Sequence, residues 1–328
     1  MQEKYLSIKD VASTHFNKLS NLKFISLIFD MKFCEHFYKI KNEEYFFFEF
    51  YKRSHKQRKT FVGSFYEEII WDSLHNDTFH DLFRKKHLFN EKFNSYLKRD
   101  WLYPRESSFE EFKAFCEKHP SFISKIDDGY GGTGVLIVDA STNNLNDLFE
   151  QLKNENRIIE EIVQQCDIFS SLHPQSVNTM RVLTVSLDNH VEVYAAFLRI
   201  GSNGSVIDNL SSSGLCAPID IKSGTVKTDA LNYIGKKIPH HPNTNIKFKE
   251  FKIPKWDEIM KTAVETASQT PDLKIIGFDI TINSNDEIVI IEANDKPGIL
   301  GQQMGNTCGS KELFNKITGG KIRWKLPY

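Results

Sequence analysis

The sequence contains no apolar run of the roughly 18 to 20 residues that a membrane-spanning helix needs. Its first ten residues, MQEKYLSIKD, carry too many charges for a secretory signal. We therefore expect a cytoplasmic protein with no membrane insertion. The five cysteines are odd in number, lie far apart and form no C-x-x-C pair, so we interpret them as reduced, mostly structural thiols rather than zinc ligands.

A strong overall charge is also lacking, since 42 Lys and Arg residues against 43 Asp and Glu residues leave a net charge of -1. This balance gives no general attraction to polyanions, so nucleic acid is not an expected partner. Residues up to Arg105 carry 19 basic and 14 acidic side chains, whereas the rest carry 23 and 29. Most of the basic excess lies in KRSHKQRK (52–59) and RKK (84–86), which we interpret as a solvated face rather than an anion-binding surface.

Proline is absent from the first hundred residues, and Gly63 is the only glycine there. Phe, Leu and Ile recur at mixed three and four spacing over 8–101, a pattern that predicts several helices. EEYFFFEFY (43–51) is apolar on too many sides for a surface helix, so we expect it in the core. At 328 residues the chain is long enough for about two domains or subdomains.

The pattern changes near residue 105. YPRESSFEEFKAFCEKHP (103–120) predicts a further helix that Ser107 or Ser108 caps. Short β-rich runs separated by turns follow, among them FISKI, GVLIVD, RVLTVSL, VEVYAAFLRI, IIGFDITI and EIVIIEA. We therefore expect a mixed α+β body after the helical part, with loops around a strand or two over 201–246.

Glycines cluster in KIDDGYGGTGVLIVD (125–139), which contains G-x-G-x-x-G at Gly129, Gly131 and Gly134. A dinucleotide-binding fingerprint leads from a strand into a helix, whereas the residues that follow here, 135–138, predict a strand. No Lys-Ser or Lys-Thr follows the last glycine, so the P-loop pattern fails too. A strand, a glycine loop and a strand remain. Such a loop can fold its backbone N–H groups over a triphosphate as a lid; the alternative is an ordinary hairpin with a generous turn.

Lys125 stands on the strand that enters this loop. There it can add a positive charge to the same phosphates, or it can be an ordinary surface lysine. Protein kinases also close a glycine-rich lid over ATP, but this chain has neither the H-R-D nor the D-F-G motif of a kinase. The kinase comparison is therefore weak.

Two acids stand in GFDITINSNDEIVIIEAND (277–295), a segment that otherwise has the pattern of a buried hairpin. With 284–285 at the tip of the NSND turn, Asp279 is predicted to lie opposite Ile290. Side chains alternate between the faces of a strand, so Glu292 is expected on the same face as Asp279, one diagonal step away.

Close carboxylates repel one another unless something positive lies between them. Magnesium is the natural candidate because it is a hard cation that takes oxygen ligands, and Asn294 on the same face can add a neutral oxygen. The alternative is a partly exposed edge hairpin with solvated acids. Arg181 and Arg199 are strand arginines between apolar neighbours, so each needs an anion, either a phosphate or an ordinary salt-bridge partner.

Taken together, these motifs resemble the ATP-grasp superfamily, in particular its sugar-transfer-associated branch, over about residues 90–310. The resemblance is carried by SKIDDGYGGTGV, IIEEIVQQ, SVNTMRVLT, AFLRIG followed by VIDNLSSSG, and GFDITI with IIEAND. It implies the ATP-grasp fold, in which two α+β subdomains clasp ATP. We expect a mainly helical N-terminal region over 1–104, the lid subdomain with the glycine loop over 105–165, and the C-terminal subdomain with the magnesium site over 166–328.

The resemblance also implies a role for single residues. The resemblance implies three kinds of ATP contact. Lys125 would reach the phosphates, and Gly129, Gly131, Gly132 and Gly134 would form the lid. The linker that contacts adenine would be Glu160, Glu161 and Val163. The residues it places beside the γ-phosphate and the acyl phosphate are Arg181, Arg199 and Asn209. Its Mg²⁺ ligands are Asp279, Glu292 and Asn294.

This chain departs from the family pattern at two points. Lys125-Ile126 stands where many members have Lys-Pro. No ribose-binding acid is evident, and Asp167 is the only candidate we can name.

The resemblance implies an enzyme that joins a carboxylate to an amine through an acyl phosphate and releases ADP and phosphate. Its expected partners are ATP, Mg²⁺ and small carboxylate and amine substrates, with a cell-surface glycan precursor as one source of either substrate. Two alternatives stay open: a kinase on the same fold that phosphorylates a hydroxyl, and a glycan-binding or scaffold protein with a vestigial nucleotide site. The substrates and the oligomeric state stay undetermined at this stage.

Overall fold

A computed structural model of the chain describes residues 7–16, 18–129, 134–188, 190–204 and 214–324. Three of the expected site residues, Gly131, Gly132 and Asn209, lie outside the described residues. None of the helices in the described ranges combines the length and the apolar character that crossing a bilayer requires.

The described N-terminal part is helical up to Leu97, as its composition predicts. Its α-helices are α1 (Ile8–His15), α2 (Asn21–Tyr38), α3 (Asn42–Phe47), α4 (His55–Arg58), α5 (Glu67–Ser73), α6 (Asp77–Arg84), α7 (Lys86–Lys92) and α8 (Asn94–Leu97), with 3-10 turns η1 (Phe50–Lys52) and η2 (Ser64–Tyr66). Phe46, Phe48 and Phe50 are at most 1% exposed, which confirms the core position expected for 43–51.

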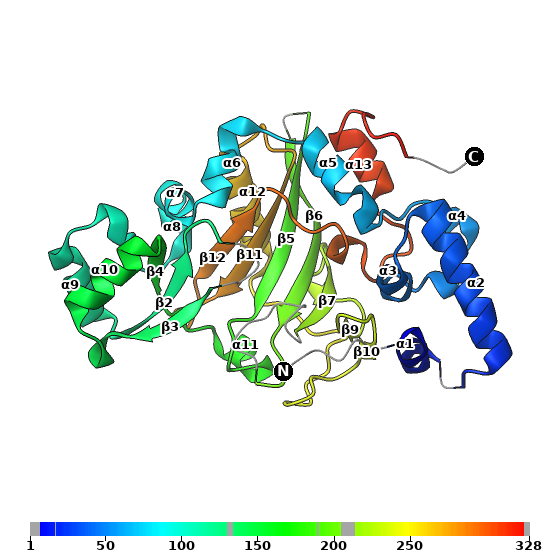
Figure 1. The fold of residues 1–328 in the computed structure, drawn as a ribbon, viewed down its shortest axis with the longest axis horizontal. Helices are drawn as coiled ribbons and strands as arrows, with labels where there is room; N and C mark the ends of the chain where they lie inside the picture. Colours follow the sequence, from blue (N-terminus) through cyan, green and yellow to red (C-terminus); the bar gives the residue numbers. More distant parts are fainter. Residues whose placement is uncertain (1–6, 17, 130–133, 189, 205–213, 325–328) are drawn as a thin grey trace.

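The first sheet has four antiparallel strands in the order β1-β4-β2-β3. They are β1 (Trp101–Leu102), β2 (Ser121–Ile126), β3 (Leu136–Asp139) and β4 (Arg157–Glu161). Helices α9 (Phe109–Lys118) and α10 (Leu145–Asn154) pack beside them in Figure 1, with 3-10 turns η3 (Pro104–Glu106) and η4 (Ala140–Thr142). Ser108 caps α9 in a capping box with Glu111, and β2 and β3 flank the glycine loop, so both local predictions are confirmed.

The second sheet has eight strands, with the order β10-β9-β7-β6-β5-β11-β12 and β8 paired to β7. Its strands are β5 (Thr179–Leu187), β6 (His190–Ile200), β7 (Leu215–Asp220), β8 (Thr225–Val226), β9 (Ala230–Leu231), β10 (Lys237–Ile238), β11 (Ile275–Ile282) and β12 (Ile288–Asn294). The remaining helices are α11 (Asp167–Leu172), α12 (Trp256–Ala267), η6 (Gly301–Gln303) and α13 (Lys311–Ile317). The expectation of one or two strands over 201–246 is wrong, because two-residue strands such as β8, β9 and β10 are too short to produce an alternating pattern.

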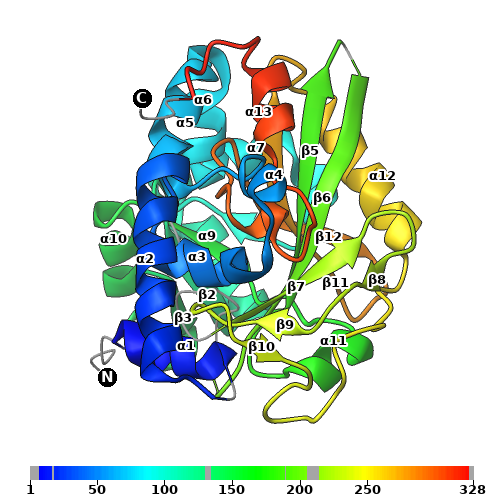
Figure 2. The ribbon, with the colours of Figure 1, turned by 90° about the vertical axis from the view of Figure 1, so that its right-hand side faces the viewer.

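The two faces of the large sheet pack against different parts of the chain. One face carries Val182 and Leu198 into a core with α12, whereas the other carries Leu183 and Phe197 into a core with the N-terminal helices. Figure 2 shows α12 on one side of the sheet and α2, α3 and α4 on the other. Because side chains alternate, Arg181 lies on the face that the N-terminal helices cover. The N-terminal region therefore encloses the polar residues of this face.

Candidate active site

A cavity of about 520 Å³ lies where the two sheets and the N-terminal helices meet. It brings together nine of the residues expected from the sequence: Lys125, Glu160, Glu161, Val163, Arg181, Arg199, Asp279, Glu292 and Asn294. The N-terminal helices add Glu43, Glu44, Phe47 and Glu67 to the wall, none of which the sequence motifs indicate. Asp167 is not among the described residues that line the cavity; it lies in the first turn of α11.

The hairpin of β11 and β12 places Asp279 directly opposite Glu292, so the predicted pairing of Asp279 with Ile290 is wrong. Asn283 accepts backbone N–H bonds from both Asn285 and Glu287 through its side-chain oxygen, which makes the turn one residue longer than a tight NSND turn. That extra residue alone would turn Glu292 to the other face. A bulge in β12 places one unpaired residue between Ile290, which pairs with Ile280, and Glu292, which pairs with Asp279. This second extra residue returns Glu292 to the face of Asp279, so the two acids do share a face.

Arg99, in the segment between α8 and β1, holds this bulge. Its guanidinium donates to the carbonyl oxygens of Ile290 at 2.7 Å and of Ile291, the extra residue of the bulge, at 2.9 Å. The Arg99 side chain is only 2% exposed. The position of Glu292 therefore depends on a buried residue that no motif contains, and only the tertiary contact identifies it.

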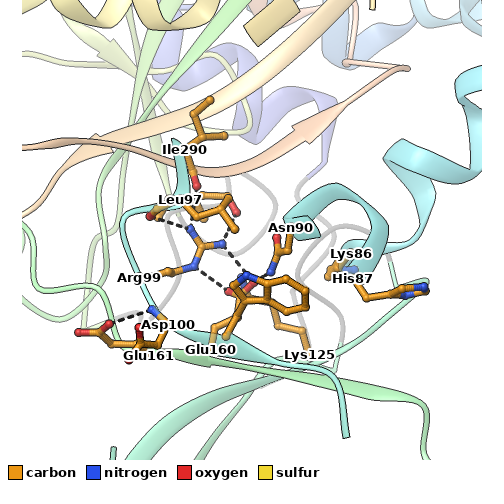
Figure 3. A network of polar contacts seen from close by, with 12 residues as sticks. Lys86, His87, Asn90, Leu97, Arg99, Asp100, Lys125, Glu160, Glu161 and Ile290 are labelled. Carbon is orange, nitrogen blue, oxygen red and sulfur yellow. Dashed lines mark hydrogen bonds and ion pairs between the residues drawn. The ribbon is translucent and has the colours of Figure 1, made fainter. Parts of the chain in front are cut away.

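The same guanidinium binds Glu160, as Figure 3 shows. Arg99 Nη2 lies 3.1 Å from Glu160 Oε1, Lys125 Nζ lies 2.6 Å from Oε2, and Asn90 Nδ2 donates to Oε1 at 3.0 Å. Burial alone would raise the pKa of Glu160, but the charges of Arg99 and Lys125 outweigh it and lower this pKa well below its usual range. Glu160 thus holds Lys125 at the cavity wall. The expected adenine contacts of Glu160, Glu161 and Val163 stay predictions.

Asp279 has two guanidinium partners on neighbouring strands. Arg181 Nε lies 2.5 Å from Oδ1 and its Nη2 lies 2.9 Å from Oδ2, while Arg199 Nη1 lies 2.6 Å from Oδ2. Burial would raise the pKa of Asp279, but the two arginines outweigh it and lower this pKa. Both arginines therefore have the salt-bridge partner that the sequence left open, and both also line the cavity.

Glu292 stands beside this cluster in a different electrostatic state. Burial raises its pKa, and the adjacent charge of Asp279 raises it further. In the part of the chain that the structure describes, no Lys, Arg or His forms an ion pair with Glu292. The Nδ2 atom of Asn294 is buried and has no hydrogen-bond partner among the described residues.

These residues fit a magnesium ion. Asp279 has accepted three guanidinium bonds, which leaves about one of its four lone-pair positions free. Glu292 shares a side-chain hydrogen bond with Asp279, and a divalent cation between the two carboxylates would replace that bond and relieve the repulsion that raises the pKa of Glu292. The donor set of two carboxylates and an amide is the oxygen chemistry that Mg²⁺ prefers.

Cations hold the described ends of the glycine loop. Lys86 Nζ donates to the carbonyl oxygens of Ile126 at 2.9 Å, Asp127 at 3.2 Å and Gly129 at 2.6 Å. At the other end Arg157 donates to the carbonyl of Gly134, whose φ of +75° is one that side chains disfavour. The lid function of the loop stays a prediction, because 130–133 lie outside the described residues.

Among the described residues, Asp100, His119 and Glu161 form another group of possible metal ligands, with their ligand atoms within 4.8 Å of one another. Asp100 already pairs with Lys118 at 2.5 Å and with His119 at 2.7 Å, and Glu161 accepts the backbone N–H of Asp100 at 3.0 Å. These contacts account for the group without an ion.

The sequence matches a family model described as sugar-transfer associated ATP-grasp over residues 78–319. The chain belongs to this family. The predicted resemblance and the ATP-grasp fold are thereby confirmed, and the part before residue 78, with Glu43, Glu44 and Glu67, lies outside the match.

Solved structures similar to this chain include several ATP-grasp proteins. The ATP-grasp ligase PsnB complexed with a minimal precursor has 13% identity and a TM-score of 0.47, covering 76% of this chain and 64% of that one. The D-alanine-D-alanine ligase from Coxiella burnetii has 8% identity and a TM-score of 0.42, covering 73% and 57%. N5-carboxyaminoimidazole synthetase from Staphylococcus aureus complexed with ADP has 12% identity and a TM-score of 0.44, covering 74% and 52%. The chain thus spans less than two thirds of the length of these structures, and no curated protein matches it.

Proposed function

We propose that this protein is an ATP-dependent carboxylate-amine ligase that acts through an acyl phosphate and uses Mg-ATP. The observation that carries the proposal is the single cavity in which a lysine, two arginines and a pair of adjacent carboxylates converge, in a chain of the ATP-grasp family. The family description, sugar-transfer associated, supports a glycan precursor as the source of one substrate.

Lys125 is the residue we assign to the nucleotide phosphates. Its ammonium is held by Glu160 at 2.6 Å, so its side chain is positioned before any ligand binds. Asp279, Glu292 and Asn294 would hold Mg²⁺, which would neutralise charge on the β- and γ-phosphates. The backbone after Glu160, at Glu161 and Val163, would contact adenine, and Asn209 would lie beside the transferred group.

Arg181 and Arg199 are assigned to the charge that develops on the transferring phosphoryl group. An arginine has five N–H donors, and the contacts of Arg181 with Asp279 use two of them, so Arg181 keeps donors for phosphate oxygens, while Arg199 contributes its positive charge at the cavity wall. Asp279 fixes both guanidinium planes, so little reorganisation is needed during reaction.

The reaction that these residues support has two balanced steps. A substrate carboxylate oxygen attacks the γ-phosphorus, the bond from that phosphorus to ADP breaks, and an acyl phosphate forms. An amine then attacks the acyl carbon, the bond from carbon to phosphate oxygen breaks, and the amide, phosphate and a proton leave. The enclosing N-terminal helices and the lid would keep water from the acyl phosphate.

Hydroxylamine trapping tests the first step. The protein is incubated with Mg-ATP, hydroxylamine and a panel of carboxylic acids, and we expect a hydroxamate and ADP in equal amounts. Lys125→Ala should abolish the product, whereas Lys113→Ala, on the exposed face of α9, should match the wild type. AMP as the nucleotide product would refute an acyl phosphate. A stable phosphorylated product without hydroxamate would indicate a kinase, and the absence of any ATP-dependent thermal shift would indicate a vestigial site.

A further inference from the structure

A second cavity, of about 850 Å³, opens beside the candidate active site. Its lining comes from the N-terminal helices and from the turn after β12, and includes Lys41, Phe65, Glu67, Trp71, His80 and Lys296. Glu67 and Asn294 line both this cavity and the active-site cavity, so the two spaces meet at these two residues. We call the second cavity the side cavity.

The junction holds two polar groups whose capacity for partners is only partly used. The carboxylate of Glu67 receives hydrogen bonds from Trp71 and from the backbone of Ile299, and the charge of Lys41 acts on it, but no ion pair within 4.0 Å reaches it from the described Lys, Arg and His side chains. The Nδ2 atom of Asn294 is buried and donates to nothing among the described residues. A buried donor without an acceptor is costly, so a ligand atom is expected there. The carboxylate in turn suits a cation.

We propose that the side cavity binds the amine substrate, and that this substrate is an amino sugar whose ammonium group rests on Glu67. Asn294 Nδ2 then donates to a hydroxyl oxygen of the same sugar. The inference rests on the proposed ligase function, because only a ligase needs an amine at this junction. The nitrogen is delivered where the two cavities meet, beside the strand that carries Glu292.

The composition of the side cavity agrees with a sugar. Hydroxyl groups both donate and accept hydrogen bonds, and the lining offers donors on Lys41 and Lys296 and acceptors on Glu67 and Asp295. Phe65 is 49% exposed and supplies an apolar ring against which the C–H face of a sugar can pack. The volume lies within the range of about 300 to 1,000 Å³ that small-molecule sites occupy.

The bound ammonium group must lose two protons: the first before its nitrogen has a lone pair that can attack the acyl carbon, and the second as the C–N bond forms and phosphate leaves. The Glu67 carboxylate can take the first proton, and its burial, which raises the pKa of Glu67, favours the proton-bound form. Glu67 would therefore bind the ammonium group and accept its first proton before the attack, and the departing phosphate would take the second.

Ligand-observed saturation-transfer NMR tests the inference on the full chain, loaded with a non-hydrolysable ATP analogue and Mg²⁺. The probes are glucosamine and glucose, which differ by one amine. We expect a signal for glucosamine at least fivefold stronger than for glucose. Glu67→Gln should reduce the glucosamine signal to the glucose level, and Phe65→Ala should weaken both. Glu117→Gln, at an exposed site on α9, is the matched control and should change neither.

Equal signals from the two probes, or a glucosamine preference that survives in Glu67→Gln, would overturn the proposal. Thermal melting of each variant shows whether it is folded, and Glu67→Asp, which keeps the charge, should retain part of the preference. Since the readout is binding, it is independent of turnover. Glucosamine binding without hydroxamate formation would refute the ligase alone, and hydroxamate formation without glucosamine binding would refute the amino-sugar site alone.

Discussion

Two buried carboxylates of this protein have similar surroundings and different roles. Glu160 is 3% exposed and Asp279 is 2% exposed, and each binds two cationic side chains. The cations of Glu160 come from separate elements, Arg99 before β1 and Lys125 on β2, whereas those of Asp279 come from the adjacent strands β5 and β6. The Glu160 cluster therefore joins different parts of the molecule, whereas all members of the Asp279 cluster lie on one sheet.

The most important difference between the two clusters is whether a second acid lies beside the buried carboxylate. No second acid is hydrogen-bonded to Glu160, at least in the described ranges, and its partners satisfy it fully. Asp279 has Glu292 directly across the hairpin, with a raised pKa and no ion pair in the same ranges. The comparison suggests that a closed cluster stabilises the fold, whereas an open one keeps capacity for a ligand. Loss of Arg99 or Glu160 should therefore act mainly on stability, whereas loss of Glu292 should act mainly on Mg²⁺ binding.

Arg99→Leu should have the largest effect on stability. It leaves Glu160 with one cation fewer and removes the donors that hold the bulge at Ile290 and Ile291. Removing one partner of a buried ion pair costs about 3 to 5 kcal/mol, so the free energy of unfolding should fall by that amount. Denaturant unfolding measures it, with Arg105→Leu as the exposed control. A loss of less than about 1 kcal/mol would contradict the closed-cluster account.

Asp279→Asn should slow the reaction and should also lower the free energy of unfolding by about 3 kcal/mol, because it too leaves two buried cations without their charged partner. The amide cannot hold both guanidinium groups, so Arg181 and Arg199 lose their fixed positions. We expect the hydroxamate rate to fall about 100-fold, equivalent to about 2.7 kcal/mol of transition-state stabilisation. The comparison is with Asp147→Asn on α10, beside the first sheet, which should keep the wild-type rate. An Asp279→Asn protein with an unchanged rate would exclude this cluster from the reaction.

Glu292→Gln and Glu160→Gln should change the free energy of unfolding in opposite directions, so this pair tests the difference between the clusters most clearly. Neutralising Glu292 removes repulsion from Asp279, so the free energy of unfolding should stay level or rise, by up to about 1 kcal/mol. Neutralising Glu160 strips two cations of their partner and should lower that free energy by about 3 kcal/mol. Denaturant unfolding of the two variants in metal-free buffer gives both values. A clear loss of free energy of unfolding in both variants would contradict the distinction between the clusters.

Ser108→Ala, at the start of α9, should give the smallest effect. Ser108 Oγ accepts the backbone N–H of Glu111 at 3.2 Å, and loss of such a cap costs about 1 kcal/mol. Ser107→Ala is the neighbouring control, since Ser107 Oγ donates to the carbonyl of Tyr103 and does not cap α9. Thermal unfolding should show a lower Tm for Ser108→Ala alone. Equal Tm values would show that α9 does not need its cap.

The sequence predicts well what local pattern determines. The helix after Ser108, the strands around the glycine loop and the shared face of Asp279 and Glu292 all follow from residue type and alternation, whereas the meeting of Lys125 with the two acids is what the family resemblance implies. The register of the hairpin does not, because it depends on a side-chain bond of Asn283 and on a bulge. The longer turn and the bulge each shift the strand pairing by one residue. Together they leave Glu292 on the predicted face, although the predicted pairing is wrong.

Tertiary contacts determine the rest. Arg99, Lys86 and Glu67 belong to no motif and act through partners about 40 to 230 residues away in the chain. The N-terminal helices were expected as a separate helical part, yet they form one wall of the cavity. Alternation and spacing relate residues within one helix or strand, so they cannot indicate which distant element forms a wall of the site.

Calorimetric titration with a non-hydrolysable ATP analogue, with and without Mg²⁺, addresses the central claim most directly. The account predicts that Mg²⁺ strengthens nucleotide binding at least tenfold in the wild type, and that Glu292→Gln loses this gain while it still binds the nucleotide weakly through Lys125. Equal affinity with and without Mg²⁺ in the wild type, or a full Mg²⁺ gain in Glu292→Gln, would contradict it.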